Sequence, residues 1–341
     1  MKHVIGISLG SSQQDFSFTT TFLGVRMRVQ RIGTDGSKTR AAKLLREWDK
    51  KADAIGLGVV KDKYKVGTTR LIEKESAELV ALVRKAPCSI GARLADIYQE
   101  WAVRHAQIHL GNYFNNQRVL FFSGLTHYKL AVTLSEWTEN LQFADALQQL
   151  AVPKMLTSLD GLQLYASGAH YVTDWTPPEV IASGPVKEWT RFVLRKALQK
   201  ATVVVAPVHE LDDFGLEELA GKTIITTTVN AQRLEAFRDK GVHLIIDGAP
   251  ELEGHVLDPA LMDAMIVAAT EKQPADLLED DYLEIINGLG IEPRLLYPNG
   301  FKRINRFAFV IHPLSQEYFK KVKPIEMLSQ VSPPVMMNSL E

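Results

Sequence analysis

The stretch that decides the fold of this 341-residue chain runs from Gly221 to Gly254 and reads GKTIITTTVNAQRLEAFRDKGVHLIIDGAPELEG. It holds two runs rich in β-branched residues, Thr223–Val229 and Val242–Asp247, with an amphipathic segment, Ala231–Lys240, between them. Continuous apolar runs separated by a helical period are typical of parallel strands that are covered on both faces. The stretch therefore predicts a βαβ unit, whose ligands would bind just after the strands.

The composition sets wide limits on function. Hydrophobic residues make up 46% of the chain and charged residues 23%, which is normal for a soluble globular protein, and the length allows two domains. The net charge of −1 gives no general attraction to nucleic acid or to an anionic membrane. The single cysteine, Cys88, excludes an internal disulfide framework and any cysteine-based zinc site. No apolar run approaches the about 18 residues of a membrane span, so we expect a cytoplasmic protein.

The alternation of strands and helices predicts an α/β fold with two Rossmann-like, three-layer domains and mostly parallel sheets. We place the first domain at residues 1–111 and the second at 112–300. Within the second, residues 148–186 are rich in Gly, Pro and Ser, which predicts an irregular connection or lid.

Residues 301–341 are expected to begin a further, incomplete domain or to form a C-terminal extension. The apolar strand Phe307–Ile311 needs partners on both sides, and the tail Lys320–Glu341 has three prolines and no sustained period. An unpaired apolar edge invites association, so we expect this strand to join a sheet edge or to pair with a second copy in a homodimer. The alternative is that Phe307–Ile311 is the last strand of the second domain.

The second predicted domain opens like a dinucleotide-binding fold but lacks the glycines of its phosphate loop. The first turn, Ser123–Tyr128, contains only Gly124, whereas a G-x-G-x-x-G turn lets the backbone reach a pyrophosphate. Lys129 could meet an anion in place of the missing glycines, and Asp145 lies where a ribose carboxylate would be expected. Gly124, Lys129 and Asp145 are therefore candidate cofactor residues of a degenerate loop, and a solvated helix start is the alternative.

Other polar loops follow predicted strands, where ligands of α/β folds gather. Backbone N–H groups and hydroxyls after the first strand suit a phosphate or carboxylate, and the acidic turn Gly33–Gly36 offers a second contact. Glu251, Glu253 and His255 alternate, so an extended loop would place them on one side, where they could bind a metal or a polyol; a solvated rim loop is the alternative. The candidate ligand-binding residues are Ser8, Gly10, Ser11, Ser12, Thr34, Asp35, Thr226, Thr227, Glu251, Glu253 and His255.

One pair of residues suggests acid–base chemistry. His209 and Glu210 follow the buried strand Thr202–Val208, and an imidazole beside a carboxylate can transfer protons. Adjacent residues on a strand point to opposite faces, so the pair needs a bend to serve one pocket.

Several short motifs fall in one order along the chain: Ser8–Ser12 (SLGSS), Arg31–Gly36 (RIGTDG), Ala52–Gly58 (ADAIGLG), Gly221–Thr226 (GKTIIT) and Pro250–Gly254 (PELEG). Over about residues 1–290 the chain resembles a bacterial family known as quinate (shikimate) 5-dehydrogenases. The resemblance implies an NAD(P)-linked dehydrogenase. The N-x-T-x-P-x-K segment of shikimate and quinate dehydrogenases has no counterpart here, nor does their glycine-rich loop.

A second resemblance covers Arg306–Leu314, RFAFVIHPL, which is similar to the opening strand of the group that includes long-chain acyl-[acyl carrier protein] reductase. In that group the dinucleotide-binding domain comes later in the chain. The resemblance implies that NAD or NADP serves the full-length protein rather than this chain.

Two functions remain open at this stage. The first is the N-terminal, substrate-recognising portion of an NAD(P)-linked oxidoreductase that acts on a small hydroxy acid or acyl substrate. The alternative is a non-catalytic, two-domain binding module for a small anionic metabolite. Both expect a small-molecule ligand and neither nucleic acid nor a membrane as partner.

Overall fold

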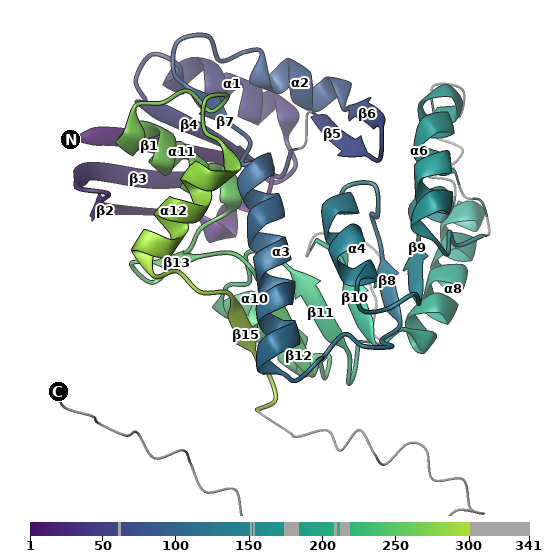
Figure 1. Ribbon diagram of the computed structural model, residues 1–341. Helices are drawn as coiled ribbons and strands as arrows, with labels where there is room; N and C mark the ends of the chain where they lie inside the picture. The colour runs from purple at the N-terminus through teal and green to yellow at the C-terminus, as the bar shows by residue number, and fades with distance from the viewer. Residues whose placement is uncertain are drawn as a thin grey trace, which may run out of the picture. The chain divides into compact units, whose positions relative to one another are not determined.

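A computed structural model describes residues 1–60, 63–150, 152, 154–173, 184–207, 210–211 and 219–300 of the chain (Figure 1). Met1–Gly300 forms one compact unit. His209 and the predicted strand Phe307–Ile311 lie outside the described residues. The predictions that residues 301–341 form an extension and that their strand pairs in a homodimer concern the same part of the chain and stay predictions.

Two sheets, mostly parallel, organise the compact unit, which confirms the predicted α/β class. In the first sheet the strand order is β2-β3-β1-β4-β7, and β2 alone runs antiparallel to its neighbour among these strands. The strands are β1 (Lys2–Ser8), β2 (Phe16–Phe22), β3 (Val25–Gly33), β4 (Ala54–Gly58) and β7 (Cys88–Ser89).

The second sheet has the order β15-β12-β11-β10-β8-β9, with β15 antiparallel to β12. Its strands are β8 (Val119–Phe121), β9 (Leu141–Phe143), β10 (Val203–Val205), β11 (Thr223–Thr226), β12 (Leu244–Asp247) and β15 (Arg294–Leu296). The βαβ unit predicted from Gly221–Gly254 is present as β11, α10 (Ala231–Asp239) and β12.

Two short hairpins and the helices complete the unit. The hairpins are β5 (Lys63–Val66) with β6 (Thr69–Ile72), and β13 (Glu251–Leu252) with β14 (His255–Val256). The further helices are η1 (Ser12–Gln14), α1 (Lys38–Trp48), α2 (Lys74–Val80), α3 (Ala92–His109), α4 (Tyr128–Ser135), α5 (Asp145–Leu150), α6 (Leu159–Thr173), α8 (Gly184–Lys200), α11 (Pro259–Thr270) and α12 (Glu279–Leu289).

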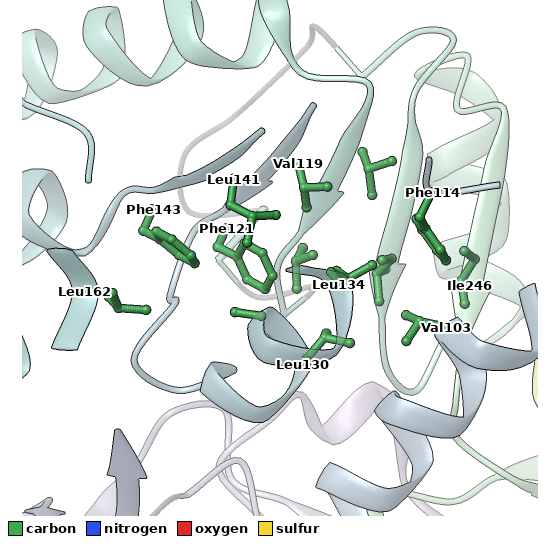
Figure 2. Close-up of a cluster of buried hydrophobic side chains, with 14 of the residues drawn as sticks. Val103, Phe114, Val119, Phe121, Leu130, Leu134, Leu141, Phe143, Leu162 and Ile246 are labelled. Carbon is green, nitrogen blue, oxygen red and sulfur yellow. The ribbon is translucent and has the colours of Figure 1, made fainter. Parts of the chain in front are cut away.

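Each sheet is covered on both faces, which gives the predicted three layers. On the first sheet, Ile5 and Ile55 pack with Leu45 of α1 and Leu79 of α2, while the opposite face packs against α3, α11 and α12. On the second sheet, α8 and α10 cover one face. The other face packs against α3, α4 and α6 in the cluster that Figure 2 shows, where Phe121 and Phe143 lie among aliphatic side chains.

The helix α11 lies unusually close to the first sheet because glycines face it. A Cβ on Gly56 would stand 2.5 Å from the carbonyl oxygen of Ala260, and one on Gly91 would stand 2.4 Å from the amide nitrogen of Ala260. Such distances are far inside van der Waals contact, so any side chain at these positions would push the helix outward. The apolar face of α11, which includes the fully buried Leu261 and Met265, then fills the space above β1 and β4.

The described chain passes between the two sheets three times. It leaves the first sheet through α3, returns from β12 through the β13–β14 hairpin to α11, and leaves again from α12 into β15. The predicted domain boundaries, 1–111 and 112–300, stay a prediction; the structure adds that α11, from the second stretch, packs on the first sheet.

One local prediction was wrong. Residues 148–186 are not irregular throughout, because they contain the 15-residue helix α6, whose Gly161 and Gly168 disguised its helical period. The strand β2, in which Phe16, Phe18 and Phe22 alternate with polar residues as an edge strand requires, was not predicted. The strand β9 ends at Phe143, so Asp145 begins the helix α5.

Replacing Gly56 with alanine tests the close approach of α11. The new methyl group overlaps backbone that cannot move aside as a flexible side chain would, so we expect Gly56→Ala to lower the free energy of unfolding by about 1–3 kcal/mol. The matched control is Gly288→Ala in α12, where a Cβ meets nothing within 4 Å; helix propensity predicts a gain of up to about 1 kcal/mol. Urea unfolding measures both, and an unchanged midpoint for Gly56→Ala would contradict the packing argument.

Candidate functional site

The helix α3 brings the carboxyl ends of the two sheets near each other. It begins after Gly91, which directly follows the carboxyl end of β7 in the first sheet. Eight residues later, the side-chain oxygen of Gln99 lies 3.0 Å from Nδ1 of His127, which follows β8 in the second sheet. At 1.5 Å per residue, Gly91 and Gln99 lie about 12 Å apart along the axis of α3.

In both sheets the order places a topological switch point at these ends. The connections leave in opposite directions from β1 and β4 in the first sheet and from β8 and β10 in the second. Ligands of open α/β sheets bind at such points. The described residues at the ends of these four strands and of their neighbours β3 and β11 therefore form the candidate site, which we call the strand-end site.

In the first sheet, the loops after β1 and β3 are bonded to each other. The amide of Thr34 donates to the carbonyl of Ser8 at 2.9 Å, and the amide of Asp35 donates to the carbonyl of Gly10 at 3.0 Å. The Asp35 carboxylate accepts in return from the amide of Ser12 at 2.7 Å, which lowers its pKa. The structure thus brings together the predicted residues of these two loops, while most of the donors expected for a ligand are engaged within the loops.

A buried arginine lies beneath these loops. The side chain of Arg31, 5% exposed, donates to the carbonyl of Ser11 at 3.0 Å and faces the carboxylate of Asp15 at 3.2 Å. Its Nε lies 3.9 Å from the carboxylate of Asp258, the N-cap of α11. Burial raises the pKa of Asp258, against the opposing effects of the Leu261 amide and of Arg31.

The second sheet fills its degenerate phosphate loop with its own carboxylate. Asp145 accepts from the amides of Gly124 at 2.8 Å and Leu125 at 2.9 Å, which are the donors that a pyrophosphate would use. A Cβ on Gly124 would lie 2.3 Å from a ring carbon of Phe143, so this glycine serves packing. The predicted cofactor role of Asp145 as a ribose ligand does not fit this geometry.

Polar groups at the second switch point include a carboxylate and an orphaned hydroxyl. The hydroxyl of Ser123, after β8, donates to the Glu210 carboxylate at 2.6 Å, and Glu210 follows β10. The buried hydroxyl of Thr226, at the end of β11, has no hydrogen-bond partner among the described residues. Thr227 is half-buried in the loop that follows. These groups can accept from or donate to a hydroxylated ligand.

A buried ion pair holds the remaining loop of the second sheet. The carboxylate of Asp247, which is fully buried, accepts from the amides of Thr228, Val229 and Ala249 and pairs with Arg294 of β15. Burial raises the pKa of Asp247, and the guanidinium of Arg294 and the backbone donors oppose that rise.

The predicted grouping of Glu251, Glu253 and His255 was wrong. They lie on the β13–β14 hairpin, whose turn sends them to different partners: Glu251 pairs with Arg294, and Glu253 accepts from Thr20 of β2. The ring of His255 stacks on Phe16 and Phe18, with centroids 4.5 and 5.3 Å apart. The hairpin therefore fastens the two sheets together, and its residues Glu251 and Leu252 line a small cavity beside Arg294.

Lys129, a predicted cofactor residue, forms ion pairs between helices. Its ammonium pairs with Glu279 of α12 at 3.1 Å and with Glu100 of α3 at 3.3 Å, so it joins three helices. Sequence reasoning missed Arg31, Asp15 and Asp258, which make the charged centre of the first strand end. A signal was available for Asp258, since Asp before Pro259 and an apolar run is an N-cap pattern, but its partner Arg31 is 227 positions away.

The described residues contain no group of three or more His, Cys, Asp or Glu side chains arranged to hold a metal ion. Among them, no helix is long and apolar enough to cross a membrane. The expectations of a cytoplasmic location and of an NAD or NADP site in a longer protein stay predictions.

Two family models match the chain, one over residues 93–298 and the other over residues 3–89, which hold the strands of the first sheet. Residues 93–298, more than half of the chain, match the family model described as Domain of unknown function (DUF8754). The chain belongs to the DUF8754 family. Residues 3–89 match a second model, Domain of unknown function (DUF8753). No curated protein matches the chain. The predicted membership of the quinate dehydrogenase family, and the likeness to the acyl reductase group, were therefore wrong.

Several solved structures of sugar-binding proteins are similar to this member of the DUF8754 family. A carbohydrate transporter solute-binding protein from Agrobacterium radiobacter, in complex with D-arabinose, is 10% identical, with 80% of this chain and 90% of that chain covered and a TM-score of 0.31. A carbohydrate transporter from Acidothermus cellulolyticus, in complex with myo-inositol, is 11% identical, with 80% and 99% covered and a TM-score of 0.29. A galactofuranose-binding protein is 11% identical, with 83% and 97% covered and a TM-score of 0.31.

The oxidoreductase prediction is corrected by these findings. The solved structures named above are of sugar-binding proteins, and neither family model names a dehydrogenase. The loop geometry explains why the sequence misled: the strand–turn–helix order is that of a dinucleotide fold, but Asp145 occupies its phosphate donors.

The pH dependence of stability should reveal the buried Asp145. Burial raises its pKa from 3.8 to about 6, against the two amide donors. The folded state then binds more protons than the unfolded state, so stability is highest below pH 3.8 and falls as the pH rises towards 6. Between pH 4.5 and 7 this group alone should cost about 2 kcal/mol. Urea unfolding of Asp145→Asn should show that much less decline than the parent; parallel curves would contradict the assignment.

Removing Arg294 should strand the Asp247 carboxylate inside the protein. A buried charge without its partner is costly, so we expect Arg294→Met to lower the free energy of unfolding by about 3–5 kcal/mol. Arg238→Met is the matched control, because Arg238 pairs with Glu235 on the exposed side of α10 and should change stability by under about 1 kcal/mol. Equal effects of the two substitutions in thermal and urea unfolding would show that the buried pair adds nothing.

Proposed function

We propose that the protein binds a small, neutral, polyhydroxylated metabolite at the strand-end site and does not convert it chemically. The observation that carries the proposal is the path of α3, which runs from the carboxyl end of the first sheet at Gly91 to that of the second sheet at Gln99. Polar groups from both switch points can thus contact one ligand.

The carboxylates around the site favour binding over proton transfer. Asp35, Asp145 and Asp247 accept hydrogen bonds from backbone amides, and Asp258 does the same as the N-cap of α11. A carboxylate that is saturated with fixed donors holds a loop in place and is poorly placed to exchange protons with a substrate. These side chains make a rigid frame for a ligand.

The charges favour a neutral ligand over the anionic one that the sequence suggested. The buried cation of the first strand end, Arg31, already faces the carboxylates of Asp15 and Asp258. The second strand end presents the Glu210 carboxylate. An anion would meet this negative charge, whereas hydroxyl groups donate to carboxylates and accept from hydroxyls such as that of Thr226.

Calorimetry with neutral polyols and with anionic metabolites tests this proposal. We expect myo-inositol or D-arabinose to bind and to raise the melting temperature, and quinate, shikimate and NADP⁺ to bind at least about tenfold more weakly. Glu210→Gln and Ser123→Ala should each weaken polyol binding by about tenfold or more, because a hydrogen bond to a charged group is worth about 1.5–3 kcal/mol.

The matched control is Glu235→Gln on α10, whose carboxylate pairs with Arg238 away from the strand ends and should leave the affinity unchanged. Preferential binding of quinate or NADP⁺, or conversion of the polyol during the titration, would disprove the proposal. So would equal polyol binding by the Glu210→Gln and Glu235→Gln variants.

A further inference from the structure

A cavity lies between α3 and α12, and none of its lining residues belongs to the strand-end site. Its volume is about 730 Å³, within the range of small-molecule sites. Its apolar part, which we call the floor, is lined by Ile97 and Trp101 of α3, Leu283 and Ile286 of α12, and Ile291.

The charge of this groove is negative on balance. Four carboxylates line it, from Glu100, Glu279, Glu284 and Glu292, against the single cation of Arg104. Arg104 is already paired with Glu100 and Glu136, and Lys129 outside the lining neutralises Glu279. Glu284 and Glu292 are exposed and form no ion pair among the described residues; burial of the His105 ring and the neighbouring His109 lower the pKa of His105, against the smaller opposing effect of Glu292. Two carboxylates therefore remain for a ligand.

An apolar floor, an aromatic ring and two uncompensated carboxylates fit one chemical class. We propose that the groove binds a small organic cation with an apolar body, at a site independent of the polyol site. The apolar part of such a ligand would cover Leu283 and Ile286, and its ammonium group would lie between the Trp101 ring and the carboxylates of Glu284 and Glu292. Cations bind aromatic faces and carboxylates together in this way.

Benzyltrimethylammonium chloride is the probe, and benzyl alcohol is its neutral counterpart with the same ring. Calorimetry should show that the cation binds at least about tenfold more tightly than the alcohol. Raising the sodium chloride concentration from about 0.05 to about 0.5 M should weaken the binding of the cation but not that of the alcohol, since salt screens only interactions between charges. Myo-inositol should not compete with it, because the two sites share no residue.

The decisive variant is Glu284→Gln with Glu292→Gln, which keeps the shape of the groove and removes its charge. It should bind the cation about tenfold more weakly and benzyl alcohol as before, at an unchanged melting temperature. Trp101→Leu should weaken both probes. The control pair is Glu235→Gln with Glu188→Gln, on α10 and α8, which should bind both probes as the parent does.

Three results would overturn the proposal. The first is equal affinity for the cation and the alcohol in the parent protein. The second is unchanged cation binding in the Glu284→Gln, Glu292→Gln variant. The third is displacement of the cation by a peptide of alternating Lys and Leu that itself binds about a hundredfold more tightly, which would make the groove a peptide site.

Discussion

The rest of the structure depends on the contact between α11 and the first sheet. Gly56 and Gly91 have no side chain where the backbone of Ala260 passes, and this lets the helix seal the sheet. Because α11 follows β12 of the second sheet in the chain, the position of α11 on the first sheet also determines where the chain returns from one sheet to the other. The same contact places Asp258, the N-cap of the helix, beside Arg31 at the first strand end. The lack of a side chain at Gly56 and Gly91 is thus needed for the packing of the core, for the return of the chain to the first sheet and for the geometry of the candidate site.

A single chemical device recurs around the strand ends: an aspartate whose carboxylate gathers backbone amides from a neighbouring loop. Asp35 does so for Ser12, Asp145 for Gly124 and Leu125, and Asp247 for the loops on either side of it. Buried backbone donors must be satisfied, and a carboxylate satisfies two or three at once. The device makes the loops rigid, but it uses the donors that an anionic cofactor would need. It therefore separates this protein physically from the dinucleotide-binding folds that its strand order resembles.

The helix α3 links both candidate sites through opposite surfaces. Gln99 contacts His127 beside the second strand end, whereas Trp101 and Arg104 line the groove against α12. Successive residues of a helix point about 100° apart, so one helix can present different residues to two sites. The charge requirements of the two sites differ as well. At the strand ends, carboxylates neutralise the cation of Arg31. In the groove, the carboxylates of Glu284 and Glu292 form no ion pair among the described residues.

The sequence by itself determined the α/β class, the parallel strands and most helices, because these follow from local patterns such as the apolar runs Thr223–Val229 and Val242–Asp247. It also placed the loops after β1 and β3 at neighbouring strand ends, since parallel strands end on one side of a sheet. Only the tertiary structure decided which groups act together. Arg31 meets Asp258, and Asp247 meets Arg294, across long separations in the chain, and periodicity carries no information about such pairs. The hairpin turn at Glu253 and Gly254 likewise divided residues that alternate in sequence, because a reversal of the strand changes the neighbours that each side chain meets.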